Sequence, residues 1–380
     1  MDKIKILFAV GRLTVGGGEK LLVYQLKHLN REKFEPYLLT LFPEKEESFA
    51  SLVGSYPTNS RVRPYYWKQL NLRRLFDIFS WFKLCRFLKK EKFDVVVTSL
   101  FSANLIVRLA LLFSGRPKVL ISYEHNIYRD KHLWQIWADW FLACFTDKII
   151  VDAESVKKFT SEQEGISSDK FLVMYIPPLA SVVKVGPPAG GPTLTDKIVL
   201  TVSRLVEEKG HIYLIRAAEK VIKIFPNVKF LIVGWGPLKE ELEKEIQSVK
   251  TRSPAGDRVL SAPIILVGRR DIAEVLPLAD VYVEPALSVD IGIASMEAMA
   301  HGLPIISTNV GEMPVFVKDG ENGFLVPPQD SNVLAEKILA LLKNDDLRKK
   351  MGEKSKERVK EFSIAGYMKK FENLILSFLK

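Results

Sequence analysis

The sequence predicts an α/β fold made of two doubly wound domains with parallel sheets. At 380 residues the chain is longer than one ordinary core and suits two domains of similar size. A hydrophobic content of 47% with 26% charged residues is typical of a folded globular protein. Apolar runs alternate with helical patterns along the whole chain, which predicts repeated βαβ units.

The expected strands are short and almost continuously apolar. In the first half they lie at 4–10, 37–42, 94–100, 118–124, 148–153 and 171–176. In the second half they lie at 197–203, 228–234, 264–268, 281–286 and 304–308. Such strands are covered by helices on both faces, as in parallel sheets. Segments such as "EKLLVYQLKHL" and "IYLIRAAEKVIKIF" have the helical period that covering helices need.

A stretch rich in Pro and Gly, "PPLASVVKVGPPAGGPTLTD", divides the chain. We therefore expect an N-terminal domain over 1–180, a linker over 181–196 and a C-terminal domain over 197–362. A final helix, at 363–380, has an apolar stripe that must dock and can pack back on the first domain. Ligands of doubly wound sheets bind beyond the carboxyl ends of the strands, so two such domains would face each other across a cleft.

The basic charge is concentrated in one segment. The net charge is +10, and residues 61–92 carry ten Lys or Arg against two Asp or Glu, a net +8. Aromatic residues interleave with these cations, which suits an anionic membrane surface. The alternative is an amphipathic helix with solvated cations, and nucleic acid is disfavoured because no nucleic-acid motif accompanies the charge. The residues expected to meet the membrane are Trp67, Arg73, Arg74, Trp81, Lys89 and Lys90.

The sequence also favours a cytoplasmic location, peripheral on the inner face of a membrane. The N-terminal apolar run is too short for a signal peptide, and no run reaches the roughly 20 apolar residues of a spanning helix. Cys85 and Cys144 form no metal-ligand spacing and no disulfide framework, which suits a reducing compartment.

One buried-looking stretch, "ALSVDIGIASMEAMAHGLPII", has a carboxylate, Glu297, in its middle. Gly292 allows the backbone to turn after a strand, and a helix is expected to start there. Free N–H groups near Gly292 and Ile293 would form an anion site, with Glu297 one turn further in. Sugar hydroxyls would donate the hydrogen bonds that such a carboxylate needs. The alternative is that Glu297 is an exposed helix residue.

A second loop, "SRLVEEKGH", places Arg204 and Lys209 at the carboxyl end of a strand. The Arg guanidinium can form bidentate hydrogen bonds to phosphate oxygens, while the Lys ammonium acts as a mobile point charge. Two cations at this place suit a diphosphate. The alternative is a pair of surface cations that neutralise Glu207 and Glu208.

These loops together resemble those of the retaining glycosyltransferases of family 4, which have the GT-B fold of two Rossmann-like domains. The resemblance covers nearly the whole chain and is strongest over 197–330. "SRLVEEKGH" resembles the R-x4-K-G loop, "GWGPLKEELEK" the G-x-G-P loop, and "EAMAHGLP" the most specific block, followed by "GENGFLVPPQD". In the first half, "GGGEK" resembles the glycine loop, and "SYEHN" places His125 at a strand end.

The resemblance implies a role for each residue. Arg204 and Lys209 would bind the donor diphosphate, and Glu297 would hold the ribose hydroxyls. The base would rest near Gly268, and His125 would lie beside the transferred sugar. Retaining transfer would need no metal, and the chain has no Asp-x-Asp pair to bind one. The resemblance therefore implies a catalytic set of His125, Arg204, Lys209 and Glu297. The donor-binding residues would be Glu297 with Gly17, Gly268, Arg269, Asp290, Gly292 and Ile293. Glu19 would lie on the acceptor side.

Three positions depart from the family pattern. Val289 stands where a glutamate usually contacts the sugar, and the neighbouring Asp290 could substitute for it. Trp235 stands where an acidic residue is common, and Val315 replaces a usual glutamate. These departures leave the sugar open, and they motivate an alternative: a non-catalytic protein that binds nucleotide sugars.

The function expected from the sequence is transfer of a hexose from a UDP- or GDP-sugar, with no cofactor. The acceptor would be a glycan or a lipid-linked sugar in polysaccharide or glycolipid biosynthesis. A sugar-nucleotide epimerase or hydrolase of the same fold is the remaining alternative.

Overall fold

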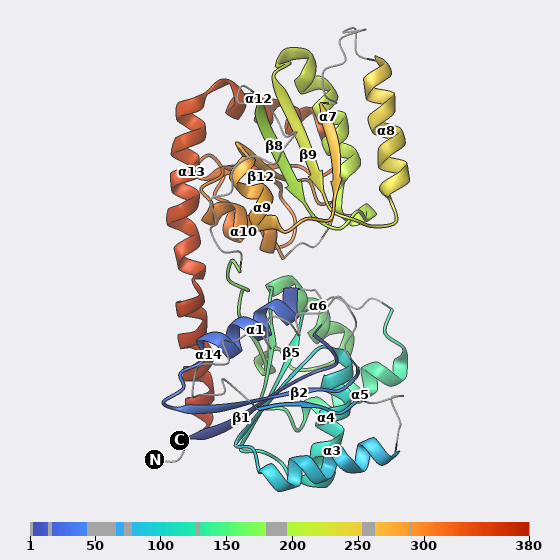
Figure 1. Cartoon of the computed structure of the whole chain (residues 1–380), viewed down its shortest axis with the longest axis vertical. Helices are drawn as coiled ribbons and strands as arrows, with labels where there is room; N and C mark the ends of the chain where they lie inside the picture. Colours follow the sequence, from blue (N-terminus) through green and yellow to red (C-terminus); the bar gives the residue numbers. More distant parts are fainter. Residues whose placement is uncertain are drawn as a thin grey trace, which may run out of the picture. The chain divides into compact units, whose positions relative to one another are not determined.

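The computed structural model describes residues 3–13, 17–43, 66–71, 78–125, 130–179, 196–252, 263–288 and 291–379. The predicted fold class is confirmed, because the chain forms two α/β units that each contain one parallel sheet (Figure 1). The first unit comprises Met1–Leu179 with Ile364–Lys380, and the second comprises Ala180–Ser363. The final helix thus belongs to the first unit, although it follows the second in the sequence.

The first unit contains a seven-stranded sheet in which every pairing is parallel. Chain order reverses once within it, between β1 and β4, as in doubly wound folds. In spatial order the strands are β3 (Tyr66–Gln69), β2 (Phe34–Thr40), β1 (Ile4–Val10), β4 (Val95–Ser99), β5 (Val119–Glu124), β6 (Lys148–Val151) and β7 (Phe171–Val173).

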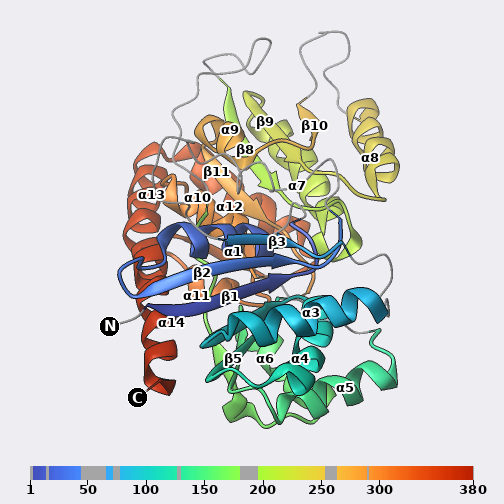
Figure 2. The same ribbon diagram turned by 60° about the horizontal axis from the view of Figure 1, so that its bottom comes forward.

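Helices cover both faces of this sheet (Figure 2). Apolar side chains of α3 and α4 pack with alternate residues of β1, such as Leu7 and Ala9, in one core cluster. On the other face, Phe8 of β1 touches Phe371 of α14, with ring centroids 6.2 Å apart. The helices are α1 (Gly17–His28), α3 (Ile78–Glu91), α4 (Phe101–Ser114), α5 (Leu133–Ala143), α6 (Glu154–Glu164) and α14 (Ile364–Phe378).

The second unit contains a six-stranded sheet, again with only parallel pairings. Chain order reverses between β8 and β11. In spatial order the strands are β10 (Ile264–Gly268), β9 (Val228–Val233), β8 (Lys197–Val202), β11 (Val281–Glu284), β12 (Ile305–Thr308) and β13 (Gly323–Val326).

The helices of the second unit also enclose their sheet. A core cluster joins α7, α8 and α12 to the buried strands. Side-chain caps fix the starts of two helices, because Asp330 accepts a hydrogen bond from Val333 N and Asn344 accepts one from Leu347 N. The helices are α7 (His211–Ile224), α8 (Lys239–Arg252), α9 (Ile272–Val275), α10 (Ile293–Ala300), α11 (Met313–Phe316), α12 (Ser331–Lys343) and α13 (Asp345–Val359).

Eleven strands match those expected from the sequence, and two further strands were not predicted. The missed strands, β3 and β13, are four residues long and lie at the edges of their sheets. Such short segments carry little apolar periodicity, so their pairing depends on the neighbouring strand.

Candidate functional site

The predicted site residues gather where the order of strands reverses in each sheet. Loops at such a switch point diverge to opposite faces and leave a crevice at the carboxyl ends of the strands. In the first unit, the loop after β1 and the end of β4 meet at this point, with β5 beside them. In the second unit, the loops after β8 and β11 meet there.

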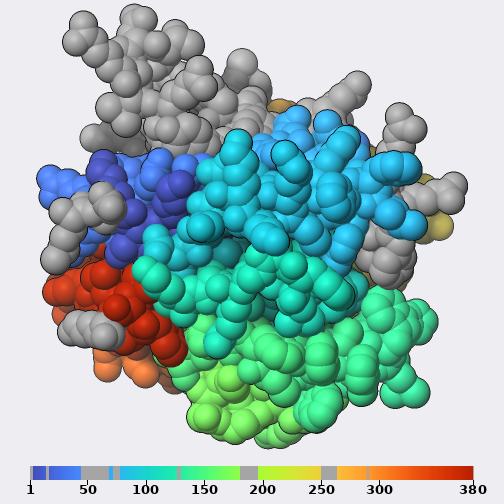
Figure 3. Space-filling view, turned by 90° about the horizontal axis from the view of Figure 1, so that it is seen from below, coloured from blue at the N-terminus to red at the C-terminus, as the bar shows by residue number. Residues whose placement is uncertain are grey.

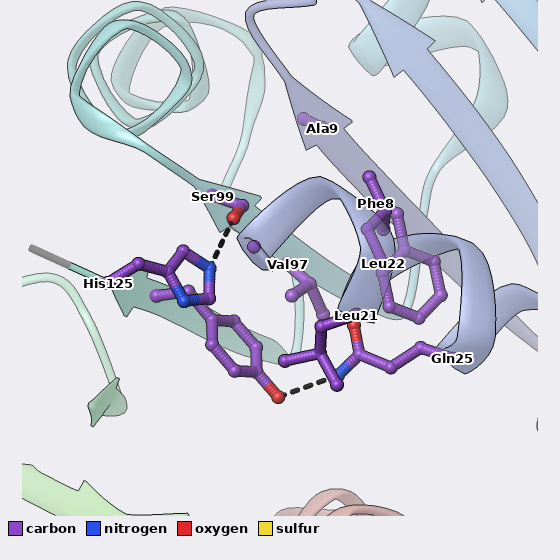
Figure 4. Close-up of a pocket in the computed structure, with 10 residues that line it drawn as sticks. Phe8, Ala9, Leu21, Leu22, Gln25, Val97, Ser99 and His125 are labelled. Atoms are coloured by element: carbon purple, nitrogen blue, oxygen red, sulfur yellow. Dashed lines mark hydrogen bonds between the residues drawn. The ribbon is translucent and has the colours of Figure 1, made fainter. Parts of the chain in front are cut away.

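His125 follows β5 and is held at both ring nitrogens. Its Nδ1 lies 2.6 Å from Oδ2 of Asp152, which follows β6, and its Nε2 lies 2.9 Å from Oγ of Ser99 at the end of β4. The ring also stacks on Tyr123, with centroids 5.4 Å apart. Figure 4 shows the bond from His125 to Ser99. The imidazole is thus fixed in position and is only 5% exposed.

The surroundings of His125 favour its protonated form. Burial is the largest influence and lowers the pKa, but the charge and hydrogen bond of Asp152, together with Glu124 and Glu19, raise it above its usual value. In the protonated ring both nitrogens donate hydrogen bonds, and both partners present oxygens. The site therefore holds a buried imidazole in one fixed orientation.

Helix α1 lies against this histidine through its glycines. Gly17 begins the helix, and a Cβ on Gly18 would lie 2.8 Å from Cδ2 of His125. Glu19, in the first turn, is buried, and its charge contributes to the raised pKa of His125. A small pocket between α1 and β5 ends at this ring, lined by Leu21, Val97 and other residues (Figure 4). Only glycine allows this close packing of helix and imidazole.

The cations of the second unit lie on the loop after β8. Arg204 extends outward, with 67% of its side chain exposed, and its Nη2 lies 2.9 Å from Oε1 of Glu208. Lys209 is more enclosed, and its Nζ lies 4.0 Å from the buried carboxylate of Glu284 at the end of β11. Lys209 is therefore charge-balanced from inside the protein, while Arg204 is held by a surface pair of small stabilising effect.

This loop is clamped against the loop after β11. The N–H of Leu287 donates a hydrogen bond to the carbonyl of Glu208, at 2.8 Å. Gly210 has φ +63°, and a Cβ there would lie 2.0 Å from the carbonyl oxygen of Pro285. The glycines of "GWGP" pack in the same way, because a Cβ on Gly236 would lie 2.4 Å from the carbonyl oxygen of Leu205. Three strand-end loops thus touch through their backbones.

Helix α10 begins at the same edge of the sheet. Gly292 takes the left-handed conformation, with φ +71°, and Ile293 is the first helical residue. A side chain at Gly292 would lie within 3.1 Å of Met313 and Phe316. Glu297 lies one turn into α10 and is only 4% exposed, so it is not the exposed helix residue of the alternative interpretation.

The remaining predicted residues are more dispersed. Gly268 ends β10 with φ +76°, and Arg269 after it is exposed. On α3, Lys89 and Lys90 are exposed, whereas Trp81 is half-buried and packs on the core. The positions of Val289, Asp290, Arg73 and Arg74, residues 181–195 of the predicted linker, and the side chain of Trp67 lie outside the described residues.

Three site residues escaped the sequence analysis. Asp152, Ser99 and Glu284 each stand at or just after the end of a buried strand, and each touches a predicted residue. Their shared signal is a polar side chain at the carboxyl end of an apolar run, as in "KIIVDA" and "VYVEPA". His211, which follows the cation loop, is buried, and burial followed by the charge of Lys209 lowers its pKa to about 4.

Family models match both halves of the chain. The model described as Glycosyltransferase Family 4 matches residues 15–176, and the model described as Glycosyl transferases group 1 matches residues 188–358. The chain belongs to the family 4 glycosyltransferases. The predicted family is therefore confirmed, and the protein is a glycosyltransferase.

Several curated glycosyltransferases are similar to this chain. A UDP-Gal:alpha-D-GlcNAc-diphosphoundecaprenol alpha-1,3-galactosyltransferase of Escherichia coli is 27% identical over 348 residues, which span 87% of this chain and 85% of that protein. A phosphatidyl-myo-inositol mannosyltransferase of Mycobacterium leprae is 36% identical over 179 residues, which span 46% of this chain and 44% of that protein.

Solved structures support the GT-B fold. HepE of Anabaena, solved in complex with UDP, superposes with a TM-score of 0.78 at 18% identity and covers 98% of this chain and 100% of that one. The lipopolysaccharide outer core galactosyltransferase WaaB superposes with a TM-score of 0.71 at 17% identity, and the match covers 98% of this chain and 99% of that one.

In the described part of the chain, no helix is long and apolar enough to cross a bilayer.

Proposed function

We propose that this glycosyltransferase moves a hexose from a nucleotide sugar to a lipid-linked or other membrane-proximal glycan acceptor, with retention of anomeric configuration and without a metal. One observation carries the donor assignment. At the switch point of the second sheet, the backbone-clamped loop of Arg204 and Lys209 contacts the loop that follows β11 and precedes α10, in which Glu297 is buried one turn in. Cations, helix N–H groups and a carboxylate suit a diphosphate joined to a ribose.

UDP is the nucleotide to test first. The relative from Escherichia coli is named for a UDP-galactose donor, and HepE was solved with UDP. Arg204 and Lys209 would bind the diphosphate, the N–H of Ile293 would donate to it, and Glu297 would accept hydrogen bonds from the ribose. Gly268 and Arg269, at the end of β10, would border the base.

Lipid-linked acceptors are favoured by the names of two relatives. One relative acts on a sugar carried by diphosphoundecaprenol, and another is a phosphatidyl-myo-inositol mannosyltransferase. We therefore assign the acceptor of this chain to sugars or polyols held at a bilayer by a lipid, as in polysaccharide or glycolipid biosynthesis.

The chemical step needs charge stabilisation more than a strong base. The bond between the anomeric carbon and the diphosphate oxygen breaks while the acceptor oxygen bonds to the same face of the sugar. The acceptor proton passes to the departing diphosphate. Arg204, Lys209 and the start of α10 would stabilise the negative charge on that leaving group in a preformed polar site. The ring of His125, fixed by Asp152 and Ser99, would border the transferred sugar and limit how it can sit.

Calorimetric titration with UDP tests the donor assignment. Glu297→Ala should weaken UDP binding about tenfold or more, because hydrogen bonds to a charged group contribute about 1.5–3 kcal/mol. Glu336→Ala, on the exposed start of α12, is the matched control and should bind as the wild type does. Wild-type affinity in Glu297→Ala would remove the ribose role. Tight binding with no turnover on lipid-linked and soluble acceptors would favour the non-catalytic alternative.

A further inference from the structure

The first unit presents an unusual number of apolar side chains to solvent. Of the thirteen large apolar side chains that are exposed among the described residues, ten belong to α3, the end of α4, and α5 with the turn after it. These elements lie next to one another on one face of the unit (Figure 3). We call this set the aromatic surface, and it consists of Ile78, Phe79, Phe82, Leu112, Phe113, Leu133, Trp134, Trp137, Trp140 and Phe145.

The three helices are joined by aromatic contacts. Trp81 of α3 meets Phe113 of α4 edge to face, with centroids 6.4 Å apart, and Phe101 of α4 meets Trp134 of α5 at 6.2 Å. Exposed apolar side chains are common singly on soluble proteins, but ten of them on three neighbouring helices are a concentration typical of a site of association. The aromatic surface is therefore expected to have an occupant.

Helix α5 is oriented with its charged side inward. Asp139 is 2% exposed and accepts hydrogen bonds from Arg108 at 2.8 Å and from Lys131 at 2.9 Å. A buried carboxylate without partners would be costly, so these two bonds fix which face of α5 points inward. The opposite face then carries Trp134 and Trp137, which are 51% and 63% exposed. The ion pairs of the fold thus hold the tryptophans in solvent.

The cations on the neighbouring helix identify the chemistry of the occupant. Lys83, Arg86, Lys89 and Lys90 are exposed on α3, and none of them forms an ion pair within the described ranges. Exposed tryptophans on α5, together with cations on α3 that form no ion pair among the described residues, suit the headgroup region of a bilayer with anionic lipids, where the indole ring is amphipathic and the phosphates balance the charge. A protein partner would leave these cations near a desolvated apolar core, where charged side chains are depleted.

We propose that the aromatic surface binds the anionic leaflet of a membrane, with the tryptophans of α5 inserted at the headgroup level and the cations of α3 against lipid phosphates. This proposal rests on the proposed function, because binding to the membrane would hold the enzyme close to a lipid-linked acceptor. It also shifts the expected contact. The sequence placed Trp81 at the membrane, but Trp81 packs on the core, and the outward-facing aromatics include Phe79 and Phe82 of α3 and the tryptophans of α5.

Vesicle co-sedimentation without donor or acceptor tests this proposal. The wild type should bind phosphatidylcholine vesicles that contain phosphatidylglycerol, and rising salt should release only part of it, because apolar insertion is not screened. The combined variant Trp134→Gln, Trp137→Gln, Trp140→Gln should lose about tenfold or more of this binding. Trp235→Gln is the matched control, since Trp235 is 61% exposed on the second unit, and it should bind vesicles as the wild type does.

Two further measurements on the combined variant separate a loss of membrane binding from a loss of folding. Circular dichroism and UDP titration of the combined variant should match the wild type, which separates lost insertion from lost folding. Unchanged vesicle binding in the combined variant would overturn the proposal. So would light scattering that shows a wild-type dimer, a monomeric variant and no vesicle binding, because a second copy would then cover the surface. Since no transfer is measured, the proposal can fail while the proposed function stands, and the reverse also holds.

Discussion

The switch points of the two units carry charge in different ways. In the first unit, His125 is buried, and both ring nitrogens are already bonded to the protein. In the second unit, Arg204 is exposed and bonded only to a surface carboxylate, and Lys209 lies 4.0 Å from Glu284. The first arrangement keeps one imidazole in a fixed place. The second holds Arg204 by a surface pair that an incoming diphosphate can replace at little cost, while Lys209 keeps the buried Glu284 as its partner.

This difference fits two distinct roles, donor binding in the second unit and orientation of the sugar in the first. A site that must exchange a charged substrate benefits from weak internal partners, since strong ones would compete with the ligand. A site that must orient a sugar benefits from a side chain that does not move. The following variants test this contrast, beginning with the largest expected effect.

Replacing Lys209 should have the largest effect on transfer. Lys209→Ala should lower kcat/KM by about 100-fold or more, as for other preformed charge contacts to a developing anion. Lys220→Ala, on the exposed surface of the same unit, is the matched control. Because Lys209→Ala also leaves Glu284 without its cation, Arg204→Ala provides a second variant whose side chain is exposed. Unchanged turnover in both variants would refute the assignment.

Two glycines with nearly the same backbone test the clamp between loops. Gly210 has φ +63° and would direct a Cβ at the carbonyl of Pro285, while Gly165 has φ +64° and open space around it. Gly165→Ala should cost about 1 kcal/mol in unfolding free energy, from the backbone conformation alone. Gly210→Ala should cost about 2 kcal/mol more, and UDP binding should weaken. Equal losses in chemical denaturation would show that the contact is unimportant.

Removing the charge beside His125 should have a smaller effect on catalysis. Asp152→Asn keeps the size of the side chain but removes the charge that raises the pKa of His125. The pKa of His125, followed by NMR, should fall in this variant, and kcat should drop about tenfold because the ring is less often protonated. UDP affinity should stay unchanged. A wild-type pKa in this variant would contradict the role given to Asp152.

The two units should also respond to pH in opposite directions. The raised pKa of His125 stabilises the first unit fully below about 6.5, and this contribution is lost as pH rises through the folded-state pKa. The lowered pKa of His211 stabilises the second unit above 6.5, and this contribution is lost as pH falls toward about 4. Each slope is at most about 1.4 kcal/mol per pH unit. Hydrogen exchange resolved by unit would measure both, and parallel slopes would contradict the account.

Most of the fold could be predicted from the sequence because its strands are buried on both faces. Such strands are continuous apolar runs, and this pattern located eleven of the thirteen. The edge strand β3, "YWKQ", escaped because it contains no aliphatic run, and β13, "GFLV", escaped because only three apolar residues stand between a glycine and a proline. The site loops were visible as glycine- and proline-rich segments between the apolar runs.

The site was only partly predictable for a physical reason. Arg204 and Lys209 stand in a recognisable loop and Glu297 in a recognisable helix block, but Asp152 and Glu284 are single carboxylates whose partners come from other strand ends. Their importance arises from the pairing order of the sheet. The outward face of α5 was equally hidden, because "LWQIWADWFLA" gives no sign that Asp139 is the buried residue.

A calorimetric comparison of UDP binding tests the central claim most directly. The wild type, Lys209→Ala and Asp152→Asn would be titrated with UDP, and turnover would be measured on the same samples. The account predicts that UDP affinity falls sharply in Lys209→Ala and is retained in Asp152→Asn, while turnover falls in both. Retained UDP affinity in Lys209→Ala, or an equal loss of affinity in Asp152→Asn, would contradict the division of donor binding and sugar orientation between the two units.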